Sequence, residues 1–330
     1  MPNKLTFIET NDIHWRLANP RARLDNYNDA MAEKIREIFA MATVYRAVAI
    51  LIPGDITDTP GLSLNAITEL AALLDQSPCP ILAIAGQHDQ WGHSPETLYR
   101  TPFGLLRRLG YIQDVDNNEA WFSIGGKQIR ISGRHYDTDA DGGDNGYYNA
   151  PPTEDGIITI HLAHGLVMES KPGFDIRCTP LSELKTDADV LCVGDYHPGI
   201  GYRQIGKSMI INPGALGRLS AGIGDMTRTV QVAKIEVYED GEIEVELLPL
   251  ECARPGSEVL SRDYLTQELE REDRTATFLS LLASEGESRF LSTQQIVEDI
   301  ARRDALPLPV IQDSLRRISE AREALQGRNA

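Results

Sequence analysis

Residues 50–58 read ILIPGDITD, and the rest of the chain can be interpreted outward from this stretch. Its apolar run begins at Ala47 and predicts a buried strand that Pro53 and Gly54 end abruptly. Asp55 then falls in the loop after the strand, where parallel α/β sheets place their chemistry. Its two carboxylate oxygens can bridge two cations. A Gly-Asp turn alone is weak evidence, so the other motifs decide its meaning.

The composition is that of a soluble globular protein of one large domain or two, with 330 residues, 42% hydrophobic and 25% charged. The four cysteines are scattered without metal-ligand spacing, which predicts reduced thiols. The sequence shows no signal peptide and no run of membrane-spanning length. We therefore expect a cytoplasmic protein without a membrane partner.

The formal net charge of −17 disfavours nucleic acid as a partner, because an acidic protein repels it at long range. A local basic patch, a cation-loaded site or a basic partner subunit could offset this repulsion.

Polar residues that bind metals follow the predicted strands one after another. Helical periodicity over residues 28–45 and 62–74 separates the first three strands, which predicts a β-α-β-α-β order with a site at the carboxyl ends. Four of the seven histidines lie in these loops, and such clusters of His and Asp are typical of metal sites. The residues are Asp12 and His14 after strand 5–9, Asp55 after 47–52, Gln87 and His88 after 80–85, His164 after 157–163, and Asp195 and His197 after 189–193.

Beyond the first strands, the pattern predicts a helix over 94–109 and a short helix over 179–185, with hairpins over 120–132 and 229–250. After Pro255-Gly256 the sequence becomes helical throughout, with candidate helices over 265–283, 293–303 and 309–325. We therefore expect two domains, residues 1–254 and a helical module over 255–330.

The ordered motifs resemble those of the calcineurin-like metallophosphoesterases. Asp12-Ile13-His14, GDITD at 54–58, GQHD at 86–89, His164-Gly165 and GDYH at 194–197 correspond to D-x-H, G-D-x-x-D, G-N-H-D/E, H and G-H-x-H. The resemblance spans residues 5–250 and implies an α/β fold, a β-sandwich flanked by helices in four αββα layers, with the C-terminal helical module added. Residues 212–218, NPGALGR, resemble a segment of SbcD-type double-strand-break nucleases, and the bacteriophage members, which also end in a helical tail, are most similar.

The resemblance implies two divalent metal ions bridged by Asp55, most simply Mn²⁺, with Mg²⁺ as the alternative. Two cations about 3.5–4 Å apart can clamp a phosphodiester and supply a hydroxide at neutral pH. His88 would contact the phosphate or the leaving oxygen as the second catalytic residue beside Asp55. The remaining ligands would be Asp12, His14 and His197 for one ion, and Gln87, His164 and Asp195 for the other.

Two residues depart from the family pattern, both at the second ion. Gln87 replaces Asn, and Asp195 replaces the first His of G-H-x-H. The added carboxylate favours Mn²⁺ or Mg²⁺ over Zn²⁺. It also makes a bound water less acidic, so a weakened one-metal site is an alternative.

The expected function is a DNA exo/endonuclease subunit that acts with an SMC-like ATPase in recombination or repair. Arg16, Arg203 and Arg218 are the predicted DNA contacts. The apolar residues of 306–318 would dock the ATPase or pack within their own module, and a homodimer through the nuclease domain would fit the family. The alternatives are a small-nucleotide metallophosphodiesterase and a non-catalytic subunit that positions DNA or its ATPase.

Overall fold

The computed structural model describes residues 3–116, 118–141, 146–152, 154, 156–173, 176–261, 263, 300, 307, 309–314 and 316–317. Two compact units divide the chain, residues 1–264 and 265–330. The predicted helices 265–283 and 293–303 lie outside the described residues, apart from residue 300. Within the predicted helix 309–325, residues 309–314 and 316–317 are described and helical. The predicted domain division at 254 stays a prediction.

The first unit contains two six-stranded mixed sheets packed face to face. In the first sheet, Phe7 lies opposite Ala49 of a parallel neighbour and Ile235 of an antiparallel one. Its strand order is β14 (Ile243–Pro249), β13 (Gln231–Tyr238), β1 (Lys4–Glu9), β2 (Ala49–Pro53), β3 (Ile81–Ile84) and β4 (Gln113–Asp114).

The second sheet has four neighbouring parallel strands with one antiparallel strand at each edge. Its strand order is β11 (Gly201–Ile205), β12 (Ser208–Asn212), β10 (Val190–Asp195), β7 (Ile158–Gly165), β6 (Lys127–Arg134) and β5 (Ala120–Ile124). A small parallel pair, β8 (Val167–Met168) and β9 (Thr179–Pro180), follows β7.

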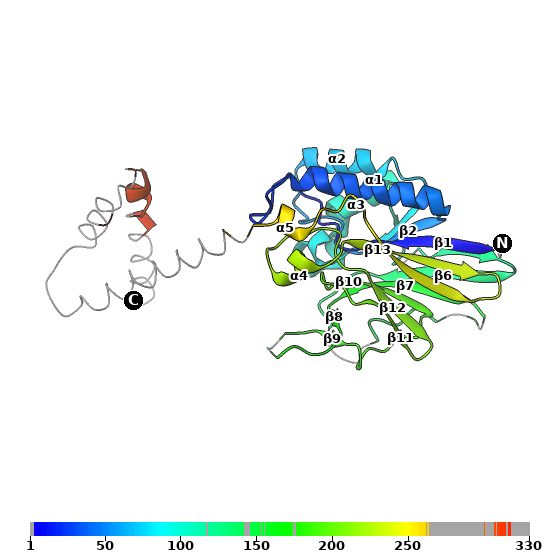
Figure 1. Ribbon diagram of the computed structural model, residues 1–330. Coiled ribbons are helices and arrows are strands. Elements are labelled where there is room, and N and C mark those ends of the chain that lie inside the picture. The colour runs from blue at the N-terminus through cyan, green and yellow to red at the C-terminus, as the bar shows by residue number, and fades with distance from the viewer. Residues whose placement is uncertain are drawn as a thin grey trace. The chain divides into compact units, whose positions relative to one another are not determined.

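Helices α1 (Tyr27–Tyr45), α2 (Leu64–Leu74) and α3 (Pro102–Leu109) cover the outer face of the first sheet (Figure 1). Side chains of the first sheet's strands alternate, so that Ile50 and Ile52 pack against the helices while Leu51 enters the core between the sheets. The predicted α/β fold, a sandwich of two mixed sheets flanked by helices, is confirmed.

Local sequence signals explain where the helices begin and end. The Asn26 side chain accepts hydrogen bonds from the first amides of α1, and Arg46 ends that helix in the left-handed conformation. Thr101 caps α3, and Gly110 ends it. The shorter helices of the first unit are α4 (Ile223–Thr227) and α5 (Gly256–Val259).

Two local predictions are wrong. The helix predicted over 94–109 is split into a 3₁₀ segment, η3 (Pro95–Arg100), and α3, because Pro102 disfavours a helical conformation for the residue before it. The short helix predicted over 179–185 is strand β9 followed by a turn. Its Thr179 pairs with Val167, and so short a segment cannot recover the entropy of helix nucleation.

Candidate metal centre

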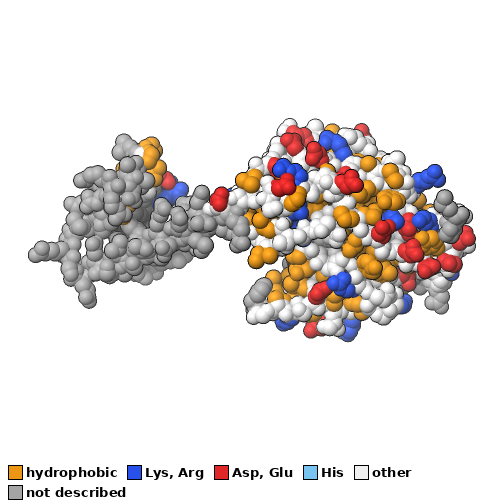
Figure 2. Space-filling model, viewed as in Figure 1, with side chains coloured by type: hydrophobic (Ala, Val, Ile, Leu, Met, Phe, Trp, Pro, Cys, Tyr) orange, Lys and Arg blue, Asp and Glu red, His pale blue; other side chains and the backbone are white. Residues whose placement is uncertain are grey.

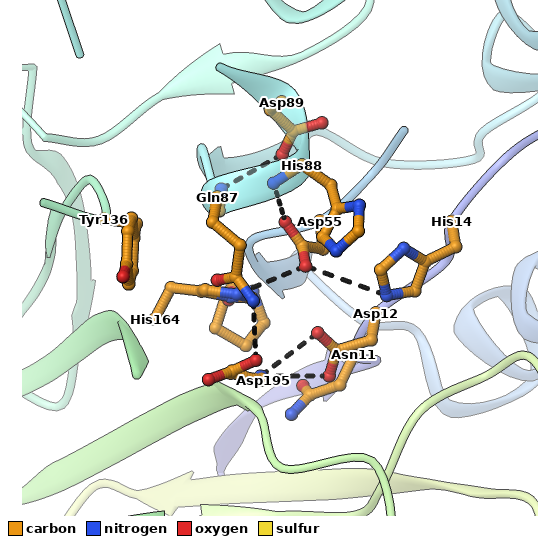
Figure 3. Close-up of polar contacts among 12 residues, drawn as sticks. Asn11, Asp12, His14, Asp55, Gln87, His88, Asp89, Tyr136, His164 and Asp195 are labelled. Carbon is orange, nitrogen blue, oxygen red and sulfur yellow. Dashed lines mark hydrogen bonds and ion pairs between the residues drawn. The ribbon is translucent and has the colours of Figure 1, made fainter. Parts of the chain in front are cut away.

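The predicted ligands come together at the carboxyl ends of strands from both sheets (Figure 3). The loops after β1, β2 and β3 carry Asp12, Asp55 and Gln87, with Gln87 opening the 3₁₀ turn η1 (Gln87–Asp89). From the second sheet, His164 belongs to the end of β7 and Asp195 is the last residue of β10. The apposition of the two sheets therefore brings residues 183 positions apart into one cluster.

The backbone of this cluster is strained. Four of its residues adopt positive φ, namely Asp12 (47°), His14 (46°), Asp55 (49°) and Asp195 (85°). Left-handed backbone at residues other than glycine costs on the order of 1–3 kcal/mol each, and such residues gather at functional sites. The strain is therefore evidence that these side chains are placed for a purpose other than packing.

Asp55 lies at the middle of the centre and is fully buried. Its Oδ1 accepts a hydrogen bond of 2.8 Å from the His88 backbone N–H. Its Oδ2 has no hydrogen-bond partner among the described residues, although it lies 3.7 Å from His14 Nε2 and 3.4 Å from His164 Nε2. An unpaired carboxylate oxygen between two imidazoles is the arrangement expected of a bridging metal ligand.

Close approach of the backbone to Asp55 depends on Gly86, because a Cβ at that position would overlap the Asp55 carboxylate. A Cβ at Gly54, which has φ of 103°, would overlap the His164 ring. Both glycines of the sequence motifs are therefore required by the packing of the centre.

We call Asp12, His14 and His197 the first half of the centre. Their ligand atoms lie within 4.8 Å of one another. His14 Nε2 and His197 Nε2 face each other at 3.0 Å, which suits neighbouring ligands on one ion with metal–nitrogen bonds of about 2.0–2.1 Å. Asp12 and His14 are buried, and His197 is half-buried.

We call Gln87, His164 and Asp195 the second half. His164 Nδ1 lies 2.7 Å from the Pro53 carbonyl oxygen. Since only an N–H can pair with a carbonyl, Nδ1 carries a proton, and Nε2 is the ring nitrogen that faces Asp55 and is left for a metal. Gln87 Nε2 donates to Asp195 Oδ1 at 2.7 Å. The Asp195 backbone N–H donates to both oxygens of Asp12 at 3.1 and 3.2 Å, which ties the two halves together.

The protonation of the ligands suits cation binding. Burial lowers the pKa of His14 to about 3, so this ring is neutral and can coordinate. Burial raises the pKa of Asp12 to about 6. Burial also opposes the charged forms of Asp55 and His164, yet their mutual attraction prevails, lowering the pKa of Asp55 and raising that of His164. A cation bound to His164 Nε2 would take the place of the proton on that nitrogen.

His88 lies beside the centre and is exposed. Its ring meets the His14 ring edge to face, with centroids 4.7 Å apart. Its Nδ1 lies 2.9 Å from the Asp58 backbone oxygen, which orients the ring and leaves Nε2 for a substrate.

Three supporting residues were not predicted as site residues. Asp89 accepts hydrogen bonds from the backbone N–H groups of Gly86, Ile56 and Thr57 and from the Thr57 hydroxyl, so it clamps the loops after β2 and β3 together. Its place in the GQHD motif was the signal in the sequence that could have identified it.

Asn11 is the second supporting residue. It donates to the Val193 carbonyl and to Asn212, which joins the ends of the two sheets.

Tyr136 is the third. Its ring centroid lies 6.1 Å from that of His164, and its backbone N–H donates to the Ala85 carbonyl. It comes from the loop after β6, for which the sequence carries no ligand motif.

The arginines predicted to contact DNA lie in different environments. Arg16 lies near the centre, where its Nη1 donates to Asp58 Oδ1 at 3.1 Å. Arg203 is exposed and pairs with Glu169. Arg218 is buried and donates to three backbone carbonyls, those of Asp225, Arg228 and Arg254. The structure therefore gives Arg218 an anchoring role inside the first unit, and its contact with DNA stays a prediction.

The two packed sheets and the cluster of Asp and His residues at their ends are the arrangement expected of a phosphoesterase that uses metal ions. A profile of the calcineurin-like phosphoesterase family matches residues 5–199, more than half of the chain. The chain therefore belongs to the calcineurin-like phosphoesterase family, whose members use a dimetal centre. No curated protein gives a significant match.

Several solved structures match this chain at low sequence identity. NAD nucleotidase from Haemophilus influenzae shares 15% identity (TM-score 0.41) over 75% of this chain and 51% of its own. A dimetal phosphatase from Danio rerio shares 14% identity (TM-score 0.45) over 76% of this chain and 99% of its own. Purple acid phosphatase PPD1 from yellow lupin shares 12% identity (TM-score 0.48) over 78% of this chain and 52% of its own. The chain thus spans about half the length of the first and third of these proteins.

Proposed function

We propose that this protein is a metal-dependent phosphodiesterase that cleaves DNA as the nuclease subunit of a recombination or repair complex. The observation that carries the proposal is the unpaired Asp55 Oδ2, held in a buried site between His14 and His164 with the ligands of both halves around it. Phosphoester hydrolysis follows from the family, and cleavage of DNA is the finer step that we propose.

The residues present fit two divalent metal ions. Buried atoms without hydrogen-bond partners in the described part of the chain include Asp55 Oδ2, Gln87 Oε1 and His164 Nε2, and all three are metal-ligating atoms. Asp12, His14, His197 and the shared Asp55 would hold one ion; Gln87, His164, Asp195 and Asp55 would hold the other. When bound, such ions supply Lewis acidity and a nucleophilic hydroxide, and we propose Mn²⁺ or Mg²⁺.

His88 acts on the substrate directly. In its protonated form it donates through Nδ1 to the Asp58 carbonyl and through Nε2 to the phosphate or the leaving oxygen. The Asp58 carboxylate holds Arg16 beside this ring, where a guanidinium can pair with a non-bridging phosphate oxygen or with the next phosphate of a strand. Loss of either residue leaves the metal ligands intact.

Two observations support DNA as the substrate: the resemblance of residues 212–218 to the SbcD-type nucleases and the position of Arg16 beside the centre. Arg218 is buried, so the proposal does not depend on a contact from it. On the face of the first unit drawn in Figure 2, Lys and Arg side chains are interspersed with Asp and Glu. DNA binding by this chain would therefore depend on the bound cations and on a partner.

A small-nucleotide substrate is the second candidate. It is favoured by the net charge of −17, since a nucleotide approaches only the centre whereas DNA also meets the acidic surface.

The partners and compartment are also proposals. Docking of an SMC-like ATPase is proposed for the C-terminal segment, in which Val310 is 47% exposed, and a homodimer is proposed for the first unit. In the described part of the chain, no helix has both the length and the apolar character needed to cross a membrane. The proposed compartment is the cytoplasm.

The test is cleavage of end-labelled linear DNA in Mn²⁺, compared with hydrolysis of bis(4-nitrophenyl) phosphate and cyclic nucleotides. Asp55→Asn is expected to lower every activity by about 10³-fold or more, because both halves lose their shared ligand. Cleavage of DNA that depends on Asp55 supports the proposal. Hydrolysis of nucleotides alone favours the second candidate, and metal binding without any hydrolysis contradicts both.

A further inference from the structure

Gln87 and Asp195, the two residues that depart from the family pattern, are hydrogen-bonded to each other. They lie 108 positions apart in the sequence, one after β3 and one at the end of β10, and their side chains meet at 2.7 Å beside His164 (Figure 3). In the sequence motifs, these are two separate amino-acid replacements. In the structure, the two replaced side chains contact each other.

The chemistry of this contact fixes the orientation of the Gln87 amide. A carboxylate only accepts hydrogen bonds, so the Gln87 atom facing Asp195 must be the NH₂ group, and Oε1 must point away from it. Among the described residues, no group donates to this buried Oε1. Leaving a buried amide oxygen unpaired costs about 1–3 kcal/mol, which a cation at the second half would recover.

The length of Gln87 follows from the fixed position of Asp195. The Asp195 backbone N–H is held by both carboxylate oxygens of Asp12, and its φ of 85° is a conformation that Asp adopts more readily than most residues. Asp195 therefore presents a short side chain from a fixed point. The extra methylene of Gln87, compared with Asn, lets its NH₂ group reach this carboxylate.

We propose that Gln87 and Asp195 form a coupled pair that makes the second half selective for hard, oxygen-preferring divalent cations such as Mn²⁺ and Mg²⁺. The Gln87 NH₂ group orients Asp195, and Gln87 Oε1 and the Asp195 carboxylate are both metal ligands. With Asp55, the second half then offers three oxygen ligands and one nitrogen, whereas the first half offers two of each. The inference rests on the proposed metal centre but not on the substrate.

The test is a double-mutant cycle that restores the family residues, with Gln87→Asn, Asp195→His and the double variant. Mn²⁺ and Zn²⁺ affinities of the metal-free full chain are measured by calorimetry, and Mn²⁺ spectra by electron paramagnetic resonance. Each single variant is expected to weaken Mn²⁺ binding at one of two sites by about 10–100-fold. The double variant is expected to regain a second ion, with the ratio of Zn²⁺ to Mn²⁺ affinity raised at least about 10-fold.

Asp195→Asn provides a variant that keeps the shape and tolerates the same backbone conformation. It is expected to lose affinity for Mn²⁺ with its fold intact, as checked by circular dichroism. Additive effects in the cycle, or unchanged Mn²⁺ affinity in both single variants, would overturn the inference. Since the readout is metal binding, failure of the DNA-cleavage proposal would leave these results unchanged, and the reverse also holds.

Discussion

The two halves of the metal centre differ in donor chemistry. Asp12 and His14 of the first half are buried, and its residues agree with the family motifs. Gln87 and Asp195 of the second half are partly exposed, and both differ from the family. His164 of the second half is fully buried, and His197 of the first half is half-buried, so the clearer difference is that a carboxylate, Asp195, replaces one imidazole in the second half. Because Gln87 and Asp195 are partly exposed, the metal preference of the second half can be altered at these two residues without repacking the core.

The largest effect that separates the halves is expected from His14→Ala compared with His164→Ala. Each variant should retain one metal ion in place of two and lose at least about 100-fold in activity, because hydrolysis uses both ions. The ion kept by His14→Ala should be Mn²⁺-preferring, and the ion kept by His164→Ala should exchange readily for Zn²⁺. Metal analysis after dialysis measures both quantities.

His161→Ala is the matched control for these variants. His161 lies in the same strand as His164 and is buried, but its Nδ1 pairs with the Ser132 hydroxyl. The control should keep both ions. If either ligand variant lost both ions, the two halves would be one site and the distinction between them would be wrong.

A smaller effect is expected from Asp89→Asn, which acts on both halves through the clamped loops. The amide would place an NH₂ group among four donors that now bond to the carboxylate. We expect destabilisation of about 2–4 kcal/mol and activity reduced about 10–100-fold. Urea unfolding and steady-state kinetics measure these, with the exposed Asp75→Asn as control. An unchanged midpoint of unfolding would show that the clamp is not needed.

The smallest effect is expected from Lys34 of α1, which stabilises the chain segment that carries the first half of the centre. Lys34 Nζ donates to the Leu216 carbonyl, and the Leu216 N–H donates to the carbonyl of Asn11, next to Asp12. Burial lowers the pKa of Lys34 to about 7, whereas the unfolded chain keeps this proton to about pH 10.4. Between these values the unfolded state binds more protons, so Lys34 makes stability rise with pH.

Lys34→Met removes that contribution. The free energy of unfolding of the native chain, relative to the variant, should increase by about 2 kcal/mol from pH 7 to pH 9. Parallel urea titrations at the two pH values measure the difference. Equal pH dependence of the two chains would contradict the assignment.

Much of the fold could be predicted because the signals are local. The periodicity of residues 28–45 and the apolar run ending at Pro53 specify α1 and β2 without tertiary information. The sequence also predicted that Asp12, Asp55 and His164 would converge, because parallel strands present their carboxyl ends at one edge, and the structure brings them together.

The remaining features depend on contacts between distant residues. The Gln87–Asp195 hydrogen bond needs the two sheets to be packed, and no spacing in the sequence encodes it. Arg218 looks like a surface charge in the sequence, but the carbonyls that enclose it come from residues 225, 228 and 254. Thr179–Pro180 resembles a helix start, yet pairing with β8 prevails over that preference.

The left-handed backbone at Asp12, Asp55 and Asp195 imposes an evolutionary constraint separate from chemistry. Asn adopts this conformation nearly as readily as Asp, whereas β-branched residues do not. In a mutational library sorted first for folding and then for catalysis, variants at these positions would fail at one of the two sorts. Asn would survive the first sort and be lost in the second, and Val would be lost in the first. Such a site can therefore evolve through proteins that fold but are inactive, and these would carry Asn at one of the three positions.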